Sequence, residues 1–282
     1  MHILIQDRQC PSSVSKKMLP FFVLSLLPLT VHCSVLTPPR NARIVGGVNV
    51  LQNDFPFAVS IHLVSRELSS CGSGYICTGT LISSWAVLTS ARCVRNGSGV
   101  RVPEELKLLV GTKSRTNCSG AVELPVEEIR MHEGANLAVL RLKWAVTGVE
   151  TAVLNEYQQV EGKQCLLVGW GANVTQSGPV EWLQEAYVRI VAQEKCSDGM
   201  ICAKGEREHA GACYGDLGAP LLCDGSVAGV LGVDSKECGG QVSVFIGVRA
   251  NYEWIRTQLS ASSIVRVCNV LIILIFIKHV IS

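Results

Sequence analysis

Short apolar runs separated by polar turns recur along most of the chain. Representative runs are FAVSIHLV, TLISSWAVLTS, LKLLVG, CLLVGWG, APLLC and VAGVLGV, with Gly, Asn and Ser residues between them. Many short strands bounded by turn residues are typical of an all-β sandwich or barrel. A helical pattern is convincing only near the end, from Tyr252 to Leu259. The pattern alone therefore predicts a β-rich protein with one or two barrels.

A longer apolar segment near the N-terminus has a different character. Lys16 and Lys17 precede the run LPFFVLSLLPLTV, which has the length and the flanks of a secretory signal peptide. We place the signal peptide at residues 1–33, with Met18 as an alternative start. The other interpretation is a buried core helix, which the terminal position and the Pro-rich segment that follows disfavour.

Composition narrows the function classes. The chain has 282 residues, of which 48% are hydrophobic and 17% charged, and its net charge is +2. So small a charge argues against nucleic acid as the main partner. The thirteen cysteines are dispersed, without the spacing of a zinc site. Together with the signal segment, they predict disulfides in a secreted, extracellular protein.

A series of motifs follows in a recognisable order. They are RIVGG (43–47), CTGTLISSWAVLTSARC (77–93), LAVLRL (137–142), CLLVGWG (165–171), MICA (200–203), CYGDLGAPLLC (213–223) and YEWI (252–255). In this order they resemble the chymotrypsin/trypsin family of serine proteases over residues 44–259. The resemblance implies an all-β fold of two packed six-stranded antiparallel barrels with a C-terminal helix. It also implies a short pro-segment, 34–43, and activation by cleavage between Arg43 and Ile44.

The catalytic positions of that family are altered. Acyl transfer by serine requires a hydroxyl nucleophile, an imidazole base and a carboxylate that orients the base. By resemblance, Arg92 stands at the base position, Asn136 at the carboxylate position and Leu217 at the nucleophile position. Arginine stays protonated, asparagine carries no charge and leucine has no nucleophilic atom. We therefore expect no proteolysis.

Two neighbouring positions keep the family's residues. Gly215 retains the backbone amide that would donate to an oxyanion. Asp216 retains the carboxylate that, in the family, pairs with the new α-amino group after cleavage, here that of Ile44. Either this conformational switch has outlived the chemistry, or the residues persist only because removing one buried partner destabilises the fold.

The substrate pocket is predicted to be shallow. By resemblance, Gly211 lies at its floor, Gly232, Val233 and Asp234 form the wall that would pair with a substrate, and Ser243 replaces a usual glycine. The loop from Gly111 to Gly120 holds no carboxylate, so we expect neither the calcium site of some relatives nor any other metal or cofactor.

The resemblance also implies a set of disulfides, which spacing alone would leave open. The expected pairs are Cys77–Cys93, Cys165–Cys223, Cys196–Cys202, Cys213–Cys238 and, between two loops adjacent in this fold, Cys71–Cys118. Three sequons predict surface glycans at Asn96, Asn117 and Asn173.

The C-terminal tail, residues 260–282, is apolar but interrupted. Its pure run VLIILIFI has only eight residues, whereas a spanning helix needs about 20. Small residues before an apolar terminus also resemble a glycolipid-anchor signal, although the polar spacer is short. The open interpretations are a glycolipid anchor, a membrane helix and a tail that anchors nothing.

Two function classes remain from the sequence. The favoured one is an inactive serine protease homologue that acts by contact with an extracellular protein, as partner, cofactor or decoy in a protease pathway. The alternative is a serine-type endopeptidase with residual or noncanonical activity, for which the motifs supply no nucleophile.

Overall fold

The computed structural model describes residues 47–50, 54–67, 70–97, 99–172, 178–192, 194, 196–207, 210–233, 238 and 242–260. The predicted signal peptide, the pro-segment, the Arg43–Ile44 bond, Asn173, Asp234 and residues 261–282 of the tail lie outside these ranges.

The first half of the described chain forms a seven-stranded antiparallel sheet. Its strands, in spatial order, are β8 (Val122–Leu124), β7 (Leu106–Val110), β2 (Ala58–Leu63), β3 (Tyr75–Ser83), β4 (Ala86–Ser90), β10 (Leu137–Leu142) and β9 (Val126–Met131). A short ribbon of β5 (Arg95–Asn96) and β6 (Gly99–Val100) projects beside it. The described pairings leave this sheet an open half-barrel.

The second half closes into a barrel. Its strands, in order, are β12 (Gln184–Ile190), β11 (Gln164–Gly169), β14 (Pro220–Cys223), β15 (Ser226–Leu231), β16 (Ser243–Gly247) and β13 (Met200–Gly205). Pairing of β12 with β13 completes the ring, and β1 (Val48–Asn49) adds to the outer side of β12. The predicted packing of two β units is confirmed, with only the C-terminal one closed.

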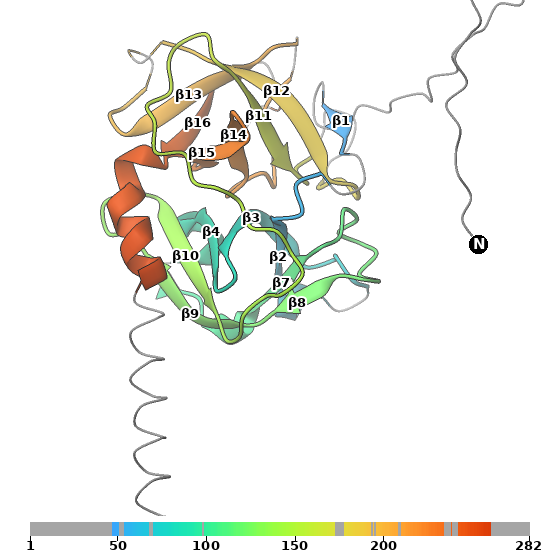
Figure 1. Ribbon diagram of the computed structural model, residues 1–282. Coiled ribbons are helices and arrows are strands. Elements are labelled where there is room, and N and C mark those ends of the chain that lie inside the picture. Colours follow the sequence, from blue (N-terminus) through green and yellow to red (C-terminus); the bar gives the residue numbers. More distant parts are fainter. Residues whose placement is uncertain are drawn as a thin grey trace, which may run out of the picture. The chain divides into compact units, whose positions relative to one another are not determined.

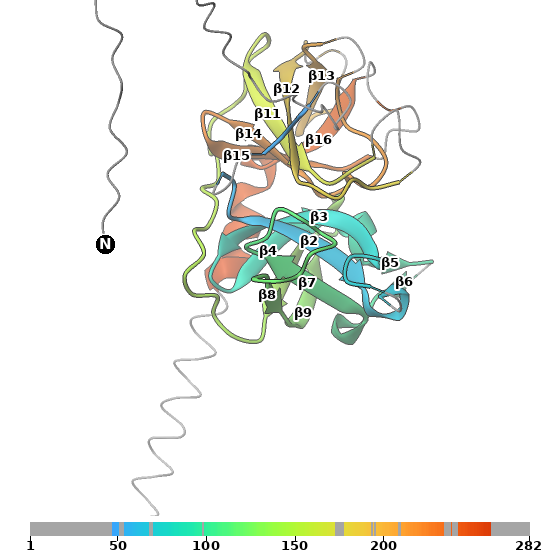
Figure 2. The ribbon, with the colours of Figure 1, turned by 90° about the vertical axis from the view of Figure 1, so that its right-hand side faces the viewer.

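The two units are stacked, as Figures 1 and 2 show from perpendicular sides. Each has an apolar interior, and a third apolar cluster joins them, with Leu88 and Val139 from the first unit and Trp170 and Val230 from the second. Every residue of β10 is buried because one face of the strand lines its own sheet and the other meets the second unit. The catalytic motifs of the sequence meet at this junction.

A helix over residues 252–260 follows η5 (Arg249–Asn251) and ends the described chain. Ile255 is fully buried in the cluster between the units, so one face of the helix is fixed there. This confirms the helix predicted from Tyr252 to Leu259. None of the helices in the described ranges is long and apolar enough to cross a membrane.

Candidate functional site

The three altered catalytic positions lie around one junction of strands and loops. Strand β4 pairs with β10 through Ser90 and Leu137, so Asn136, just before β10, lies beside Arg92, on η2 (Ala91–Val94). Leu217 belongs to the loop that leads into β14, and its carbonyl accepts a hydrogen bond from the Thr78 amide at 2.9 Å. The fold therefore gathers residues that are far apart in the sequence.

Asn136 uses both ends of its side-chain amide. Its Oδ1 accepts from the Arg92 backbone N–H at 3.0 Å, and its Nδ2 donates to the Gly232 carbonyl at 2.5 Å. Its own carbonyl accepts from the Ala91 N–H at 3.2 Å. A carboxylate here would have no hydrogen to offer Gly232, and would set a negative charge against that carbonyl oxygen. The amide thus fits this site better than an aspartate would.

Leu217 is half-buried and packs against the apolar core of the first unit. Arg92, in contrast, is exposed. The Leu217 side chain therefore contributes to packing, and the only charge among the three positions is a permanent positive one.

Gly218 fixes the turn that follows Leu217. Its φ of 79° lies in the left-handed region, and a Cβ there would come within 2.1 Å of the Thr78 carbonyl oxygen and 2.2 Å of the Thr89 hydroxyl. Glycine is the residue that tolerates both constraints. The turn therefore keeps Leu217 close to β3 and β4.

The neighbouring Gly215 is held by a tyrosine. Its φ is 90°, and its carbonyl accepts a hydrogen bond of 2.8 Å from the Tyr75 hydroxyl, which also contacts the Thr78 hydroxyl at 2.8 Å. Tyr75 is buried, and burial together with the nearby Asp216 raises the pKa of its phenol. The tyrosine therefore acts as a neutral hydrogen-bond donor that anchors the loop.

Arg115 braces Tyr75 from the other side. Its guanidinium lies 5.7 Å from the centre of the Tyr75 ring, and it donates to three backbone carbonyls at 2.7–2.8 Å, those of Gly72, Pro179 and Val180. Burial lowers the pKa of Arg115. The sequence motifs missed this network, whose one visible signal is a tyrosine two residues before Cys77.

Asp216 is fully buried beneath this loop. Its carboxylate accepts backbone N–H bonds from Gly171 at 2.8 Å and from Cys213 at 2.9 Å. A Cβ on Gly171 would lie 2.2 Å from the carboxylate carbon, so only glycine fits there. Because Ile44 lies outside the described residues, its pairing with Asp216 stays a prediction.

The structure describes four of the residues predicted to form the substrate pocket, Gly211, Gly232, Val233 and Ser243. Ser243 is only 7% exposed, and its hydroxyl accepts the Ala212 N–H at 3.4 Å, beside Gly211. Gly232 is buried and bonded to Asn136, whereas Val233 is 46% exposed. A serine side chain thus lies where the resemblance places a glycine, and the shallow groove stays a prediction.

The structure also contains a serine–histidine–acid series that the motifs did not predict. Nε2 of His62 lies 2.9 Å from the Ser60 hydroxyl, and its Nδ1 lies 3.4 Å from a Glu67 carboxylate oxygen. Ser60 and His62 are completely buried. Ser60 and His62 are two residues apart on one strand, so their side chains lie on the same face, and this spacing was the signal in the sequence that could have indicated the contact.

Burial determines the charge states of this series. It lowers the pKa of His62 to about 4, which outweighs the opposing effect of Glu67, so the imidazole is neutral. Backbone bonds from Gly72 and Gly74 keep the pKa of Glu67 below its usual value despite desolvation. Ser60, His62 and Glu67 therefore form a polar network that is buried, with only the Glu67 side chain, 10% exposed, in contact with solvent.

All five expected disulfides are present. They are Cys71–Cys118, Cys77–Cys93, Cys165–Cys223, Cys196–Cys202 and Cys213–Cys238. Such a set indicates an oxidising, extracellular type of environment. Asn96 and Asn117 are exposed, as sequons require. Within the described ranges, no group of three or more His, Cys, Asp or Glu side chains could hold a metal ion.

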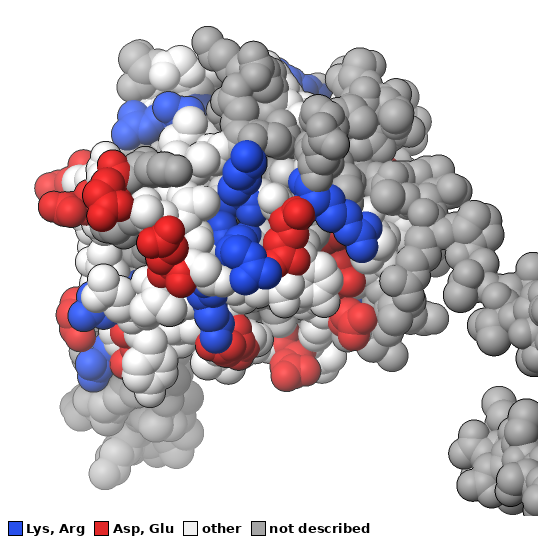
Figure 3. Space-filling view, turned by 90° about the horizontal axis from the view of Figure 1, so that it is seen from above, with Lys and Arg blue, Asp and Glu red and all other residues white. Residues whose placement is uncertain are grey.

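Charges of both signs are interspersed on the face shown in Figure 3. Ion pairs of the second unit, considered apart from this view, include Lys163 with Asp224 at 2.5 Å and Arg189 with Glu206. This face therefore does not form a uniformly basic surface of the kind that binds nucleic acid.

Comparisons with known proteins agree with the geometry. The model of the Trypsin family matches residues 44–255. Chymotrypsin-like elastase family member 1 of Macaca fascicularis is 32% identical over 285 residues, which cover 87% of this chain and 100% of the relative. Coagulation factor XII of Cavia porcellus is 31% identical over 221 residues, which cover 66% of this chain and 34% of the relative.

Solved structures show the same fold. Human heparin binding protein superposes with a TM-score of 0.66 at 22% identity, over 77% of this chain and 97% of that one. Neuropsin, a serine protease expressed in the limbic system of mouse brain, gives 0.65 at 24% identity, over 76% and 98%. At these identities the likeness concerns the fold.

Proposed function

The chain belongs to the trypsin family of serine proteases, and on that premise we propose that it is a catalytically inactive homologue that acts outside the cell by contact with another protein. The observation that carries the proposal is the identity of the three residues at the catalytic junction. Arg92 is no base, Asn136 is no carboxylate and Leu217 is no nucleophile.

The way these residues are accommodated supports the same conclusion. Asn136 joins the Arg92 and Gly232 backbones through bonds that need an amide, and Leu217 packs into the core. Restoring a catalytic residue would thus disturb contacts that now stabilise the junction. The site has become a structural element of the fold.

The surface beside Leu217 supplies a candidate contact area. Tyr214, three residues before Leu217, is 63% exposed, and Val233, next to the Gly232 that bonds to Asn136, is 46% exposed. Exposed apolar and aromatic side chains of this kind are enriched in protein-binding surfaces. We propose that a protein partner contacts this area, with the chain serving as partner, cofactor or decoy in an extracellular protease pathway.

The alternative, a serine endopeptidase of unusual design, has one observation in its favour. Ser60, His62 and Glu67 have the order of contacts that activates a serine nucleophile. Their burial argues against it, because a substrate carbonyl would have to reach a hydroxyl with no exposed surface. The names of the relatives describe those proteins. For this chain to share a protease activity, it would need a serine hydroxyl that a substrate can reach.

The proposal is tested with the secreted protein, cleaved after Arg43 and incubated with a peptide library. We expect no hydrolysis of the peptides. We also expect binding of the partner protein to depend on the exposed side chains beside Leu217, such as Tyr214. Tyr214→Ala should weaken binding of the captured partner, whereas Trp144→Ala, an exposed aromatic residue of another segment, should not. Hydrolysis that a serine-directed inhibitor blocks would contradict the proposed inactivity. Equal effects of the two variants on partner binding would contradict the proposed contact area.

A further inference from the structure

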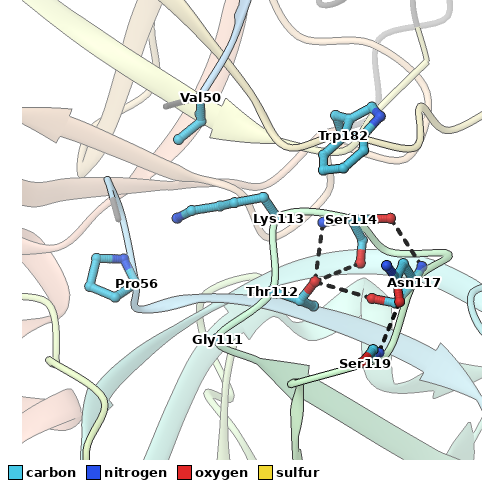
Figure 4. Close-up of a pocket in the computed structure, with 9 residues that line it drawn as sticks. All are labelled: Val50, Pro56, Gly111, Thr112, Lys113, Ser114, Asn117, Ser119 and Trp182. Atoms are coloured by element: carbon cyan, nitrogen blue, oxygen red, sulfur yellow. Dashed lines mark hydrogen bonds between the residues drawn. The ribbon is translucent and has the colours of Figure 1, made fainter. Parts of the chain in front are cut away.

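A cavity of about 470 Å³ lies away from the altered catalytic junction. Its wall includes Val50 and Pro56 on one side and the loop from Gly111 to Ser119 on the other, with Trp182 above that loop (Figure 4). The volume lies within the roughly 300–1,000 Å³ of small-molecule sites. Neither the family motifs nor the proposed protein contact involves this cavity.

The loop that forms its floor is internally fixed. The Thr112 hydroxyl donates to the Ser114 carbonyl at 2.9 Å, and the Ser114 hydroxyl accepts the Asn117 N–H at 3.0 Å. Ser114 also forms an isolated β-bridge with Trp182, so the two sides of the cavity are joined by the backbone. A loop held in this way is preorganised, which lowers the entropic cost of binding a ligand.

The side chains that face the cavity have a distinctive chemistry. Trp182 is 43% exposed and offers an aromatic surface, and Thr112, Asn117 and Ser119 add hydroxyl and amide groups. The Lys113 ammonium, in contrast, donates to the Asp54 carbonyl. Figure 4 shows the indole above the part of the loop that carries Ser114 and Asn117. One aromatic face combined with several hydroxyl and amide groups suits a ring that is apolar on one side and carries hydroxyls at its edge.

One of these residues also begins a sequon, which predicts a glycan attachment site. Asn117 begins the sequon Asn117-Cys118-Ser119 and is exposed. Its Oδ1 accepts a hydrogen bond from the Ser119 N–H at 3.0 Å. This bond does not involve Nδ2, the atom to which a glycan is attached. The acceptor thus lies in the wall of a cavity that suits a saccharide.

We propose that this cavity is a saccharide-binding site in which Trp182 stacks on an N-acetylglucosamine ring. The ring comes either from the glycan on Asn117 of the same chain or from a separate saccharide. Both sources offer the same chemistry, and the indole face and the polar groups of the loop recognise it in the same way.

The test uses the full chain secreted from cells that attach N-glycans. Glycopeptide mapping measures occupancy of Asn117, acrylamide quenching measures exposure of Trp182, and titration with chitobiose, the N-acetylglucosamine disaccharide, measures binding. Trp182→Phe isolates the contribution of that indole to the fluorescence. Asn96→Gln removes another exposed sequon and serves as the matched control.

Each source predicts its own result. If the Asn117 glycan fills the site, enzymatic deglycosylation exposes Trp182 to quenching and creates chitobiose binding that the glycosylated protein lacks, whereas Asn96→Gln changes neither. If a separate saccharide fills it, the untreated protein binds chitobiose. In both cases Trp182→Ala, with an unchanged melting temperature, weakens chitobiose binding about tenfold. Absence of chitobiose binding in both forms, with quenching insensitive to deglycosylation, would overturn the proposal.

Discussion

The side-chain amide of Asn136 joins two backbone segments of the junction. The 2.5 Å bond from the Asn136 amide to the Gly232 carbonyl requires a hydrogen that a carboxylate lacks at neutral pH. At the same time, the Arg92 N–H still reaches the same side chain at 3.0 Å. Both bonds therefore fix the backbone around the position that the family resemblance assigns to the catalytic carboxylate.

Leu217→Ser should not restore catalysis. The new hydroxyl would have no base, because a guanidinium group is not a general base. We expect no turnover of a peptide library and a loss of about 2–4 kcal/mol in the free energy of unfolding, since a leucine that packs against the core is shortened. Denaturant unfolding and peptide cleavage measure the two effects, and turnover by this single variant would show that a base exists elsewhere.

His62 should make stability depend on pH. Its folded pKa of about 4 lies below the value of 6.5 expected in the unfolded chain. Stability is therefore complete above pH 6.5 and falls as the pH decreases towards 4, because the unfolded chain takes up a proton that the folded chain refuses. The limiting slope is about 1.4 kcal/mol per pH unit. Denaturant unfolding between pH 7 and 5 measures it, with His62→Gln as the variant in which the slope should flatten.

At the scale of elements, disulfides close segments of very different length. Cys71–Cys118 joins residues 47 positions apart, whereas Cys196–Cys202 joins residues only 6 apart. A longer closed loop restricts the unfolded chain more strongly. The two bridges therefore form an internal comparison of their effects on stability.

Replacing both Cys71 and Cys118 with Ser should lower the free energy of unfolding by about 2–4 kcal/mol. The same change at Cys196 and Cys202 should cost less, because its loop is shorter. Chemical denaturation of the two double variants gives the comparison. An equal or reversed order would mean that contacts in the folded state, and not chain entropy, determine the contribution of these bridges.

Local patterns predicted a β-rich fold and the C-terminal helix. The five disulfide pairs followed from the resemblance to the family, because spacing alone leaves the pairing open. The sequence did not predict the anchoring of Gly215 by Tyr75 and Arg115, which joins side chains from β3 and from the 111–120 loop. Nor did it predict closure of only the second barrel, which depends on the long-range pairing of β12 with β13. Contacts of this kind are set by the assembled fold.

At the scale of the whole molecule, the open question is whether cleavage after Arg43 still changes the protein. Asp216 is buried and already accepts backbone bonds from Gly171 and Cys213. A new α-amino group on Ile44 would add an opposite charge to that buried carboxylate, which stabilises a buried ion. The retained residues therefore predict a response to cleavage in the absence of catalysis.

Cleavage after Arg43 should raise the melting temperature. Asp216→Asn should abolish this increase, and it should also lower the melting temperature of the uncleaved form, because an amide has one oxygen to accept the Gly171 and Cys213 N–H bonds. Thermal unfolding of the two proteins, each before and after cleavage, measures this. Identical melting temperatures for the wild-type protein before and after cleavage would mean that the Arg43–Ile44 motif and Asp216 are a structural remnant.

The central claim, that the chain lacks a working nucleophile, is tested most directly by labelling with a serine-directed fluorophosphonate. The secreted wild-type protein, cleaved after Arg43, is incubated with the reagent and every serine is mapped by mass spectrometry, with an active trypsin-family protease as positive control. The account predicts full labelling of the control and none of this chain, including Ser60, whose hydroxyl is buried against His62. Stoichiometric labelling of Ser60 or of any other serine, accompanied by peptide hydrolysis, would contradict it.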